Sequence, residues 1–420
     1  MEYYNNVIQH LQWQVMEIQM NGMLVDMDRA TAMRELADAK YKEYNGWINE
    51  ALGYKLNPNS PKQVLECLTK DLGLSIPQVK KEGIWRDSTD ELSLLKATIP
   101  LPQAMPVVEA LIACRDVRKK SGTYLNPVPW RDGRVRSQFR LYGTLTWRLS
   151  SRDPNLQNLP RRESHGIDVK SMYIAPPGTR LVELDYSALE DRIPSYASGC
   201  KTLIDLFDTG ANVHLYRANE MFGGKWTNKK ECPTEYDLAK RTRYAKGYGA
   251  SAPKVSDTLF LEMHKYFAPS FVAALIDKMD ATMPEVIAWH NWCWEEAEKT
   301  GIVYDGFGTP RILYSPKREL RQTAYSWPTQ ATASGIMNRS LVRIYHAKRA
   351  GLLRSDTRCI CQVHDSLVFE IHEDFVESEA RIIKGLMEEP VTIFDRLTVF
   401  PVEAKSGSNW SEMKEMRFAA

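Results

Sequence analysis

Residues 359–371, with the sequence CICQVHDSLVFEI, constrain the fold most, because His364 and Asp365 lie between two runs that alternate apolar and polar side chains. Alternation with a period of two is typical of β-strands, and Asp is common in turns, so the segment predicts an antiparallel hairpin. A turn alone would explain the aspartate. A hairpin turn could also present the carboxylate to a metal ion, and these residues by themselves leave both interpretations open.

Periodic patterns divide the 420 residues into regions that would suffice for two or three structural units. Apolar residues spaced by three and four predict helices at 7–20, 28–52, within 57–74, at 104–121, 189–300 with a break near 223–235, 320–350 and 375–389. Strands are expected at 180–186, in a hairpin after 302, around Asp365 and near 400. Because strands and helices alternate without a strict βαβ rhythm, we expect an α+β fold.

Composition and charge exclude several classes of protein. The 55 basic and 53 acidic residues give a net charge of +2, so charge alone does not indicate a nucleic-acid binder. No stretch approaches the ~18 apolar residues of a membrane span, and the first residues lack a signal-peptide pattern, so we expect a cytoplasmic protein. Seven scattered cysteines without CxxC spacing predict neither a disulfide framework nor a zinc site.

Basic residues are grouped in short runs. These runs lie at 115–120, 161–162, 240–246, 317–321 and 339–343. Each alone is most often a solvated helix face, and only their convergence on one groove would form a track for phosphates.

Asp185 ends the apolar run RLVELD directly before a helical start. Such an aspartate can cap the next helix. Alternatively, Asp185 and Asp365 could bracket a pair of Mg²⁺ ions, since two-metal phosphoryl transfer needs few protein carboxylates when phosphate and water complete the coordination.

A second candidate site lies in YDLAKRTRYAKGYG, where Lys240, Tyr244 and Tyr248 share one helix face and Gly249 follows as a stop. A cation and two aromatic rings along one ridge can bind a triphosphate and stack on a base. A packing stripe on a surface helix is the alternative interpretation.

Four stretches, TWRLSSRDPNLQNLP, VELDYSALEDR, KRTRYAKGYG and QVHDSLVFE, occur in an order and at spacings that resemble the family A DNA polymerases, the DNA polymerase I type. The resemblance covers nearly the whole chain, from MNGMLVD to GSNW. It implies a right-hand polymerase fold with a helical thumb, an antiparallel β-sheet palm and helical fingers. The implied segments are a palm-associated N-terminal helix at 1–23, the thumb at 24–125, the palm at 126–210 and 320–420, and the fingers at 211–319.

The resemblance also implies roles for single residues. Asp185 and Asp365 would be the catalytic carboxylates that bind two Mg²⁺ ions, for which Mn²⁺ can substitute, with the backbone carbonyl of Tyr186 as a further ligand. Lys240 would bind the incoming triphosphate and offset its developing charge. Nucleotide binding would also involve Glu190 as the sugar gate, His214, Tyr244 and Tyr248. DNA binding is implied for Arg148, Asn155, Gln157, Asn158, Gln330 and His364.

Two of these implied contacts explain how a base pair is checked. Arg148 and Gln330 would meet minor-groove acceptors that all correct pairs share, so that pair shape is tested without sequence being read. His364 would touch the primer terminus. Tyr248 would stack near the templating base and control its entry.

Several positions depart from the family pattern. Tyr236 stands where an arginine usually contacts the triphosphate, and Arg241 or Arg243 are candidates to supply that contact. The other departures are Trp147 for a usual Gly, Ala188 for Gln, Gln322 for Arg, Ser326 for Asn and Ser366 for an acidic residue. They suggest a divergent, phage- or plasmid-like member with altered triphosphate handling.

The expected function is template-directed DNA synthesis from primer-template DNA and dNTPs. We expect no proofreading, because no acidic DxE cluster on a strand precedes residue 120; an exonuclease, helicase or processivity factor would be a separate partner. The alternatives are a single-subunit RNA polymerase, against which Glu190 argues, a catalytically silent DNA-binding factor, and a two-metal nuclease. The phenol of Tyr244 would fill the place of a missing 3′-hydroxyl, so dideoxynucleotides should be accepted well.

Overall fold

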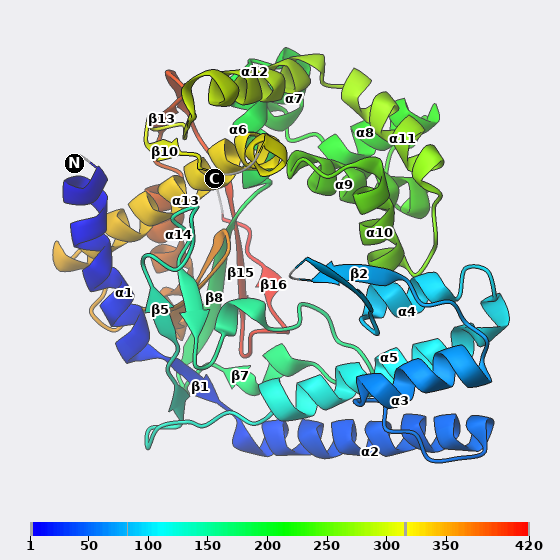
Figure 1. The fold of residues 1–420 in the computed structure, drawn as a ribbon. Helices are drawn as coiled ribbons and strands as arrows, with labels where there is room; N and C mark the ends of the chain where they lie inside the picture. The colour runs from blue at the N-terminus through cyan, green and yellow to red at the C-terminus, as the bar shows by residue number, and fades with distance from the viewer. Residues whose placement is uncertain (1–2, 82, 315–316, 419–420) are drawn as a thin grey trace.

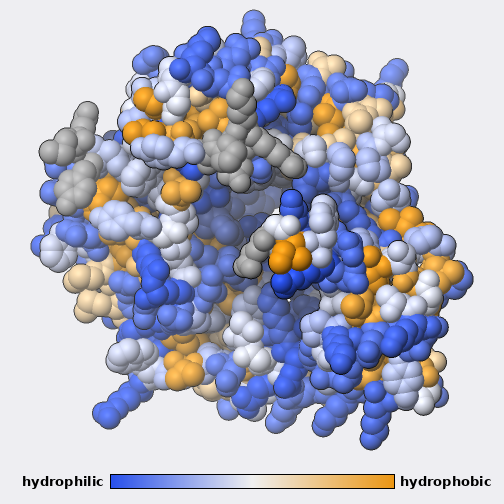
Figure 2. Space-filling view, viewed as in Figure 1, coloured by the Kyte–Doolittle hydropathy of each residue, from blue (hydrophilic) through white to orange (hydrophobic). Residues whose placement is uncertain are grey.

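A computed structural model describes residues 3–81, 83–314 and 317–418 of the chain. Three groups of elements surround the centre of the molecule (Figure 1), and the space-filling view in Figure 2 shows that the surface is deeply hollowed there. Residues 1–2, 315–316 and 419–420, which belong to the predicted segments 1–23, 211–319 and 320–420, lie outside the described residues.

The first group is a sheet of five strands in the order β11-β12-β8-β15-β16. All neighbours in it are antiparallel. Its strands are β11 (Arg358–Val363), β12 (Ser366–His372), β8 (Thr179–Tyr186), β15 (Val402–Gly407) and β16 (Lys414–Glu415). β12 pairs with β8 along its whole length, from Ser366 opposite Asp185 to His372 opposite Thr179. The central strands thereby fix the register of both predicted aspartates.

Four helices pack around this sheet and form the largest apolar core with it. They are α1 (Gln9–Asn21), α6 (Leu189–Ser198), α13 (Lys317–Arg349) and α14 (Val376–Met387). α1 contacts β11 and α13, and α14 contacts β8 and β15. Because the sheet is covered, Leu367, Val368 and Phe369 are buried in succession along β12, so this strand does not alternate between buried and exposed side chains.

The second group is helical and lies below the hollow in Figure 1. It contains α2 (Met27–Leu52), α3 (Pro61–Glu66), α4 (Glu91–Ala97) and α5 (Met105–Lys119). Asp26 caps α2 by accepting from the backbone N–H of Arg29, and Gly53 ends the helix with a φ of 75° that suits glycine. α2 packs along α5, and a separate core forms between these helices.

The third group is a set of helices above the hollow (Figure 1). It contains α7 (Lys201–Asp208), α8 (Val213–Phe222), α9 (Pro233–Gly247), α10 (Ala252–Met263), α11 (Pro269–Ala281) and α12 (Pro284–Thr300). α8, α9, α10 and α11 pack on one another around an apolar core of their own. α9 ends where Gly249 takes a φ of 73°, as the sequence predicts.

Short strands and helical turns complete the chain. Two of the short sheets are β4-β1-β7, formed by β4 (Arg134–Val135), β1 (Met23–Val25) and β7 (Tyr173–Ile174), and the pair β5 (Gln138–Arg140) and β6 (Ser150–Arg152). The remaining hairpins are β2 (Gln78–Lys81) with β3 (Ile84–Asp87), β9 (Ile302–Tyr304) with β10 (Pro310–Ile312), and β13 (Val391–Ile393) with β14 (Arg396–Thr398). Single turns η1 (Tyr4–Ile8), η2 (Cys67–Asp71) and η4 (Lys120–Tyr124) extend α1, α3 and α5.

The α+β prediction and the hairpin around Asp365 are confirmed. Sequence analysis did not predict the β2–β3 hairpin. All seven cysteines are buried and unpaired, in agreement with the expected lack of a disulfide framework. In the described parts of the chain, no helix combines the length and apolar character needed to cross a membrane.

Candidate active site

The two predicted carboxylates lie side by side at one end of the central sheet. Asp185 is the second-last residue of β8, and Asp365 lies in the turn between β11 and β12. Ser366, directly after Asp365, pairs with Asp185, and the backbone N–H of Tyr186 donates to the carbonyl of Asp365 at 3.1 Å. The two aspartates, 180 positions apart in the sequence, therefore lie at the ends of neighbouring strands. His364 takes a φ of 54°, which the tight turn requires.

Both carboxyl groups are protonated more readily than an ordinary aspartate. Burial raises the pKa of Asp185 to about 7, and the negative charges of Asp365 and Glu183 add to this effect. Burial also raises the pKa of Asp365 to about 6, although Arg148 opposes the rise. Two acids that resist ionisation beside each other form a site that a bound cation would stabilise.

The donor set at this position fits a hard divalent cation. Among the described residues, no three His, Cys, Asp or Glu side chains are grouped as a protein-only metal cluster. Mg²⁺ does not need such a group, because it retains water and phosphate ligands beside one or two carboxylates. The phenol of Tyr186 points into the core, where it bonds Ser340 and the carbonyl of Met387, each at 2.6 Å. Tyr186 can therefore offer only its backbone to the site.

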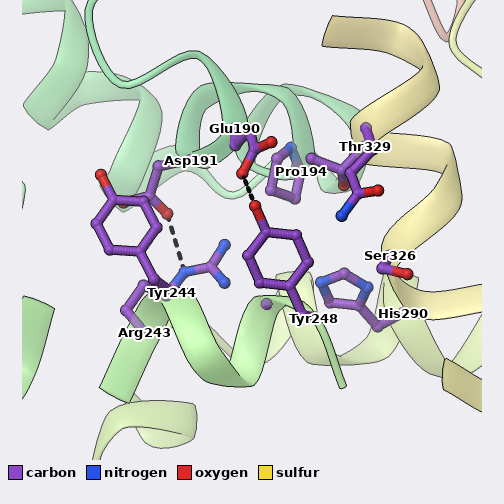
Figure 3. A pocket seen from close by; sticks show the side chains of 11 residues that line it. Glu190, Asp191, Pro194, Arg243, Tyr244, Tyr248, His290, Ser326 and Thr329 are labelled. Carbon is purple, nitrogen blue, oxygen red and sulfur yellow. Dashed lines mark hydrogen bonds and ion pairs between the residues drawn. The ribbon is translucent and has the colours of Figure 1, made fainter. Parts of the chain in front are cut away.

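A chain of polar contacts joins these carboxylates to the helices above the hollow. The guanidinium of Arg148 pairs with Glu190, and its Nη2 lies 3.9 Å from Oδ1 of Asp365. Glu190 in turn accepts a hydrogen bond from the hydroxyl of Tyr248. Figure 3 shows Tyr248 and Glu190 pointing toward one another across the space between α6 and the end of α9. Glu190 thus links Arg148 to Tyr248 by direct contacts with both.

The helix face predicted on α9 lies beside α8. The His214 ring lies 6.0 Å from that of Tyr236 and 5.7 Å from that of Tyr244, measured between centroids. Burial, with Lys240 among the nearby cations, lowers the pKa of His214 to about 4, so its imidazole is neutral at pH 7. Its buried Nδ1 has no hydrogen-bond partner among the described residues.

Arg241 and Arg243 are not placed to replace the missing arginine at position 236. Arg241 pairs with Glu262 and lies 3.9 Å from Asp237. Arg243 is 5% exposed, and its Nε lies 2.9 Å from a carboxylate oxygen of Asp191. Both cations already have carboxylate partners in this structure, which does not favour either for that contact.

Asp191 is the centre of a buried ion cluster that sequence analysis missed. Its carboxylate accepts hydrogen bonds from Arg217 at 2.6 and 3.2 Å and also pairs with Arg243. Burial alone would raise the pKa of Asp191, but the two guanidinium groups outweigh it and hold that pKa below its usual range. The cluster ties α6 to α8 and α9, and so fixes the helix that bears Lys240 next to the helix that bears Glu190.

A pocket opens between α6, α9, α12 and α13 beside this cluster (Figure 3). Tyr244, Tyr248 and Gln330 line it together with His290, whose ring stacks on Tyr325 at 4.9 Å. Gln330 therefore lies near Glu190 and Tyr248. His290 was not singled out from the sequence, where a lone histidine on a helix carries little signal.

The predicted DNA-binding residues near the turn divide into two kinds. Gln157 donates to the side-chain oxygen of Gln362 at 2.8 Å, and Gln362 in turn donates to the carbonyl of His364, so Gln157 supports the turn from below. Asn155 accepts from the backbone N–H of Gln157 at 3.1 Å and caps the short turn η5 (Leu156–Asn158). Asn158 is exposed. The first two residues thus have a structural role in the absence of DNA.

The basic runs do not all contribute to one surface. Arg115 donates to the carbonyls of Pro58 and Thr89, and Lys120 is 2% exposed, 3.0 Å from Asp116. The run at 115–120 is therefore partly structural. By contrast, Arg161 is close enough to lower the pKa of His364 and to oppose the rise at Asp365, a role that spacing in the sequence did not indicate.

Comparison with known proteins agrees with this arrangement. Residues 27–412 match the family model "DNA polymerase family A". Among curated relatives, the thermostable DNA polymerase I of Thermus aquaticus is 32% identical over 377 residues, which is 86% of this chain and 42% of that protein. DNA polymerase I of Pseudomonas aeruginosa is 32% identical over 416 residues, or 94% of this chain and 42% of that protein. The chain thus spans less than half the length of these relatives.

A solved structure shares the fold. The POL domain of Pol1 from M. smegmatis, in complex with DNA primer-template and dNTP, superposes with a TM-score of 0.84 at 24% identity, over 98% of this chain and 71% of that one. The predicted fold, that of a polymerase domain of the DNA polymerase I type, is therefore confirmed. Because the family model matches residues 27–412, which are most of the chain, the chain belongs to DNA polymerase family A.

Proposed function

We propose that this chain carries out template-directed DNA synthesis, adding dNTPs to a primer 3′-hydroxyl with release of pyrophosphate. The observation that carries the proposal is the pair Asp185 and Asp365 on neighbouring strands, linked through Arg148 to Glu190 and Tyr248. The M. smegmatis relative, which was solved with DNA primer-template and dNTP, supports the same choice of substrates. The thumb would be 24–125, the fingers 211–319, and the palm the remainder from 126 with the N-terminal helix at its side.

Asp185 and Asp365 would hold two Mg²⁺ ions, with the backbone carbonyl of Tyr186 as a further ligand. When bound, such a pair lowers the pKa of an attacking hydroxyl and stabilises the leaving oxygen. The turn that bears Asp365 is fixed by the backbone hydrogen bond from Tyr186 and by Gln157 beneath it, so the carboxylate is held in place before substrate arrives.

The residues of α8 and α9 would receive the nucleotide. Lys240 supplies the positive charge to the triphosphate, since among the described residues it has no carboxylate within 4.0 Å. His214, being neutral, contributes a hydrogen bond and not a charge. Tyr244 and Glu190 border the sugar, with Glu190 filling the space that a ribose 2′-hydroxyl would need. Tyr248 would have to release Glu190 when the templating base enters.

On the DNA side, Arg148 and Gln330 would contact the minor groove of the terminal pair and His364 the primer end. Burial lowers the pKa of His364, so it approaches the primer as a neutral group. Asn155, Gln157 and Asn158 would bind nearby DNA, the first two while also holding the turn. These roles follow the family pattern and are supported by the proximity of Arg148, Gln330 and Asp365 to Glu190.

Primer extension on a defined template with Mg²⁺ tests the proposal. Asp185→Ala and Asp365→Ala should each abolish extension while duplex binding, measured by fluorescence anisotropy, is retained, because phosphate contacts elsewhere supply most of the affinity. Asp374→Ala is the matched control, since this exposed aspartate lies just beyond the opposite end of β12 and should leave extension unchanged. Extension by either active-site variant would refute the assignment, and equal use of rNTPs and dNTPs would favour an RNA polymerase.

A further inference from the structure

Trp147 occupies a backbone conformation that large side chains rarely adopt. It has a φ of 63°, in the left-handed region, and it directly precedes Arg148 in the loop between β5 and β6. Holding a bulky residue there costs energy, and the conformation persists only where the surroundings impose it. The surroundings of Trp147 therefore have to supply that energy.

Contacts from two distant segments, the N-terminal residues and α13, hold Trp147. Its indole packs against the ring of Tyr3, with centroids 6.1 Å apart, and against the apolar cluster that includes Trp327. The side chain of Asn338 on α13 donates both to the carbonyl of Trp147 and to the hydroxyl of Tyr3, at 3.1 Å each. The N-terminal segment thus contacts the side chain of Trp147, and α13 contacts both its side chain and its backbone.

The same loop is secured on either side of Trp147. The indole N–H of Trp327 donates to the carbonyl of Leu145 at 2.8 Å, and the hydroxyl of Thr144 donates to the carbonyl of Arg148 at 2.9 Å. The loop can therefore hardly shift as a whole. The left-handed backbone of Trp147 determines the direction in which the chain leaves the loop, and this direction determines the orientation of the Arg148 side chain.

Arg148 connects the backbone conformation of Trp147 to the candidate active site. Its guanidinium pairs with Glu190 and lies 3.9 Å from Asp365. We propose that Trp147 is a positioning residue: its indole, held by Tyr3 and the α13 cluster, imposes the left-handed turn that aims Arg148 at Glu190 and Asp365. Resting on the proposed function, this makes Trp147 a determinant of how strictly the enzyme demands a correctly paired primer end.

The consequence differs from that of a general structural defect. A misaimed Arg148 loses its contact with a correctly paired terminus, whereas a mismatched terminus has little such contact to lose. Trp147→Gly, which removes the indole and accepts the left-handed φ, should therefore lower kcat/KM for a matched primer end by about tenfold, within the range for a displaced positioning group. Extension of a mismatched end should change less, so that discrimination falls. Trp147→Ala keeps the strained φ without the packing and should lose more than Trp147→Gly.

The test is a double-mutant cycle read as the ratio of kcat/KM for matched and mismatched primer ends. Trp147→Gly should reduce this ratio in the parental chain but change it less than about twofold when Arg148→Ala is already present, because the two then act through one contact. Tyr3→Leu, a milder removal of the supporting ring, should give a smaller loss that Arg148→Ala also masks. Trp130→Ala, at a tryptophan that is 66% exposed, is the control expected to leave the ratio unchanged.

Thermal unfolding of each variant establishes that it is folded. An unchanged ratio in folded Trp147→Gly and Tyr3→Leu, or a loss that adds fully to that of Arg148→Ala, would overturn the inference while parental extension still upheld the proposed function. Failure of the parental chain to extend a matched primer would instead count against the proposed function itself.

Discussion

Replacing Asp191 by Asn should destabilise the helices around it by about 3–5 kcal/mol, the usual result of leaving buried charges without their partner. The carboxylate is 2% exposed and serves two guanidinium groups, Arg217 at 2.6 Å and Arg243 at 2.9 Å, which are 0% and 5% exposed. Within the described parts of the chain, no other carboxylate lies within 4.0 Å of either cation. The amide would leave two positive charges that neither an anion nor bulk water reaches.

The penalty should depend on pH in a defined direction. Because Arg217 and Arg243 hold the folded-state pKa of Asp191 below the unfolded value of 3.8, its stabilisation is complete above that value and is lost as the pH falls below it. The difference between Asp191→Asn and the parental chain should thus be largest at neutral pH and shrink under acid conditions. Urea unfolding at pH 7 and at about pH 3, where the unfolded carboxyl is mostly protonated, measures it; with an m-value of about 3 kcal/mol/M, the midpoint at pH 7 falls by about 1 M or more.

A surface ion pair is the matched control for this experiment. Glu377→Gln removes one ion-pair partner of Arg381, at 3.0 Å, where the carboxylate is 64% exposed, and should change stability by less than about 1 kcal/mol. Hydrogen exchange in α8 and α9 shows whether the loss is confined to the helices that Asp191 joins. The reasoning fails if Asp191→Asn unfolds within 1 kcal/mol of the parental chain at pH 7, or if exchange accelerates only elsewhere.

Three further outcomes are expected. Lys240→Ala should raise KM for dNTPs by about 10- to 100-fold, as expected for the loss of a charged contact. Steady-state extension kinetics measure this, and a fall in kcat with an unchanged KM would contradict it. The pKa values of Asp185 (about 7) and Asp365 (about 6) are raised, and protonated carboxylates cannot hold a cation, so Mg²⁺ affinity should weaken from pH 8 to pH 6. The measurement is the Mg²⁺-induced rise in Tm, which should be smaller at pH 6. A rise in Tm that is independent of pH would argue against the site. Tyr244→Phe should reduce dideoxynucleotide incorporation relative to the parental chain in a termination assay, and equal discrimination would count against a role for the phenol.

Sequence reasoning located the features that depend on neighbours along the chain. The strand that ends at Asp185, the turn at Asp365 and the helix that ends before Gly249 follow from alternation, helical spacing and glycine, all of which act locally. The cluster of Asp191 depends on Arg217 and Arg243, which follow it by 26 and 52 positions, and nothing local marks a charge in an amphipathic helix as buried. For the same reason, the motif pattern alone could not show that Arg243 is already paired.

The charges on α8 and α9 indicate what Tyr236 would change at the proposed nucleotide site. On α9, Arg241 and Arg243 are paired with carboxylates; on α8, His214 is neutral because burial lowers its pKa to about 4. Tyr236 is itself fixed, with its hydroxyl 3.4 Å from the amide nitrogen of Asn212 and its ring against His214, and its phenol adds a polar group without charge. Lys240 is then left as the principal positive charge on this ridge. Under the proposed function, triphosphate binding would then rest on one cation and several neutral donors, and we expect its dependence on ionic strength to be correspondingly shallow.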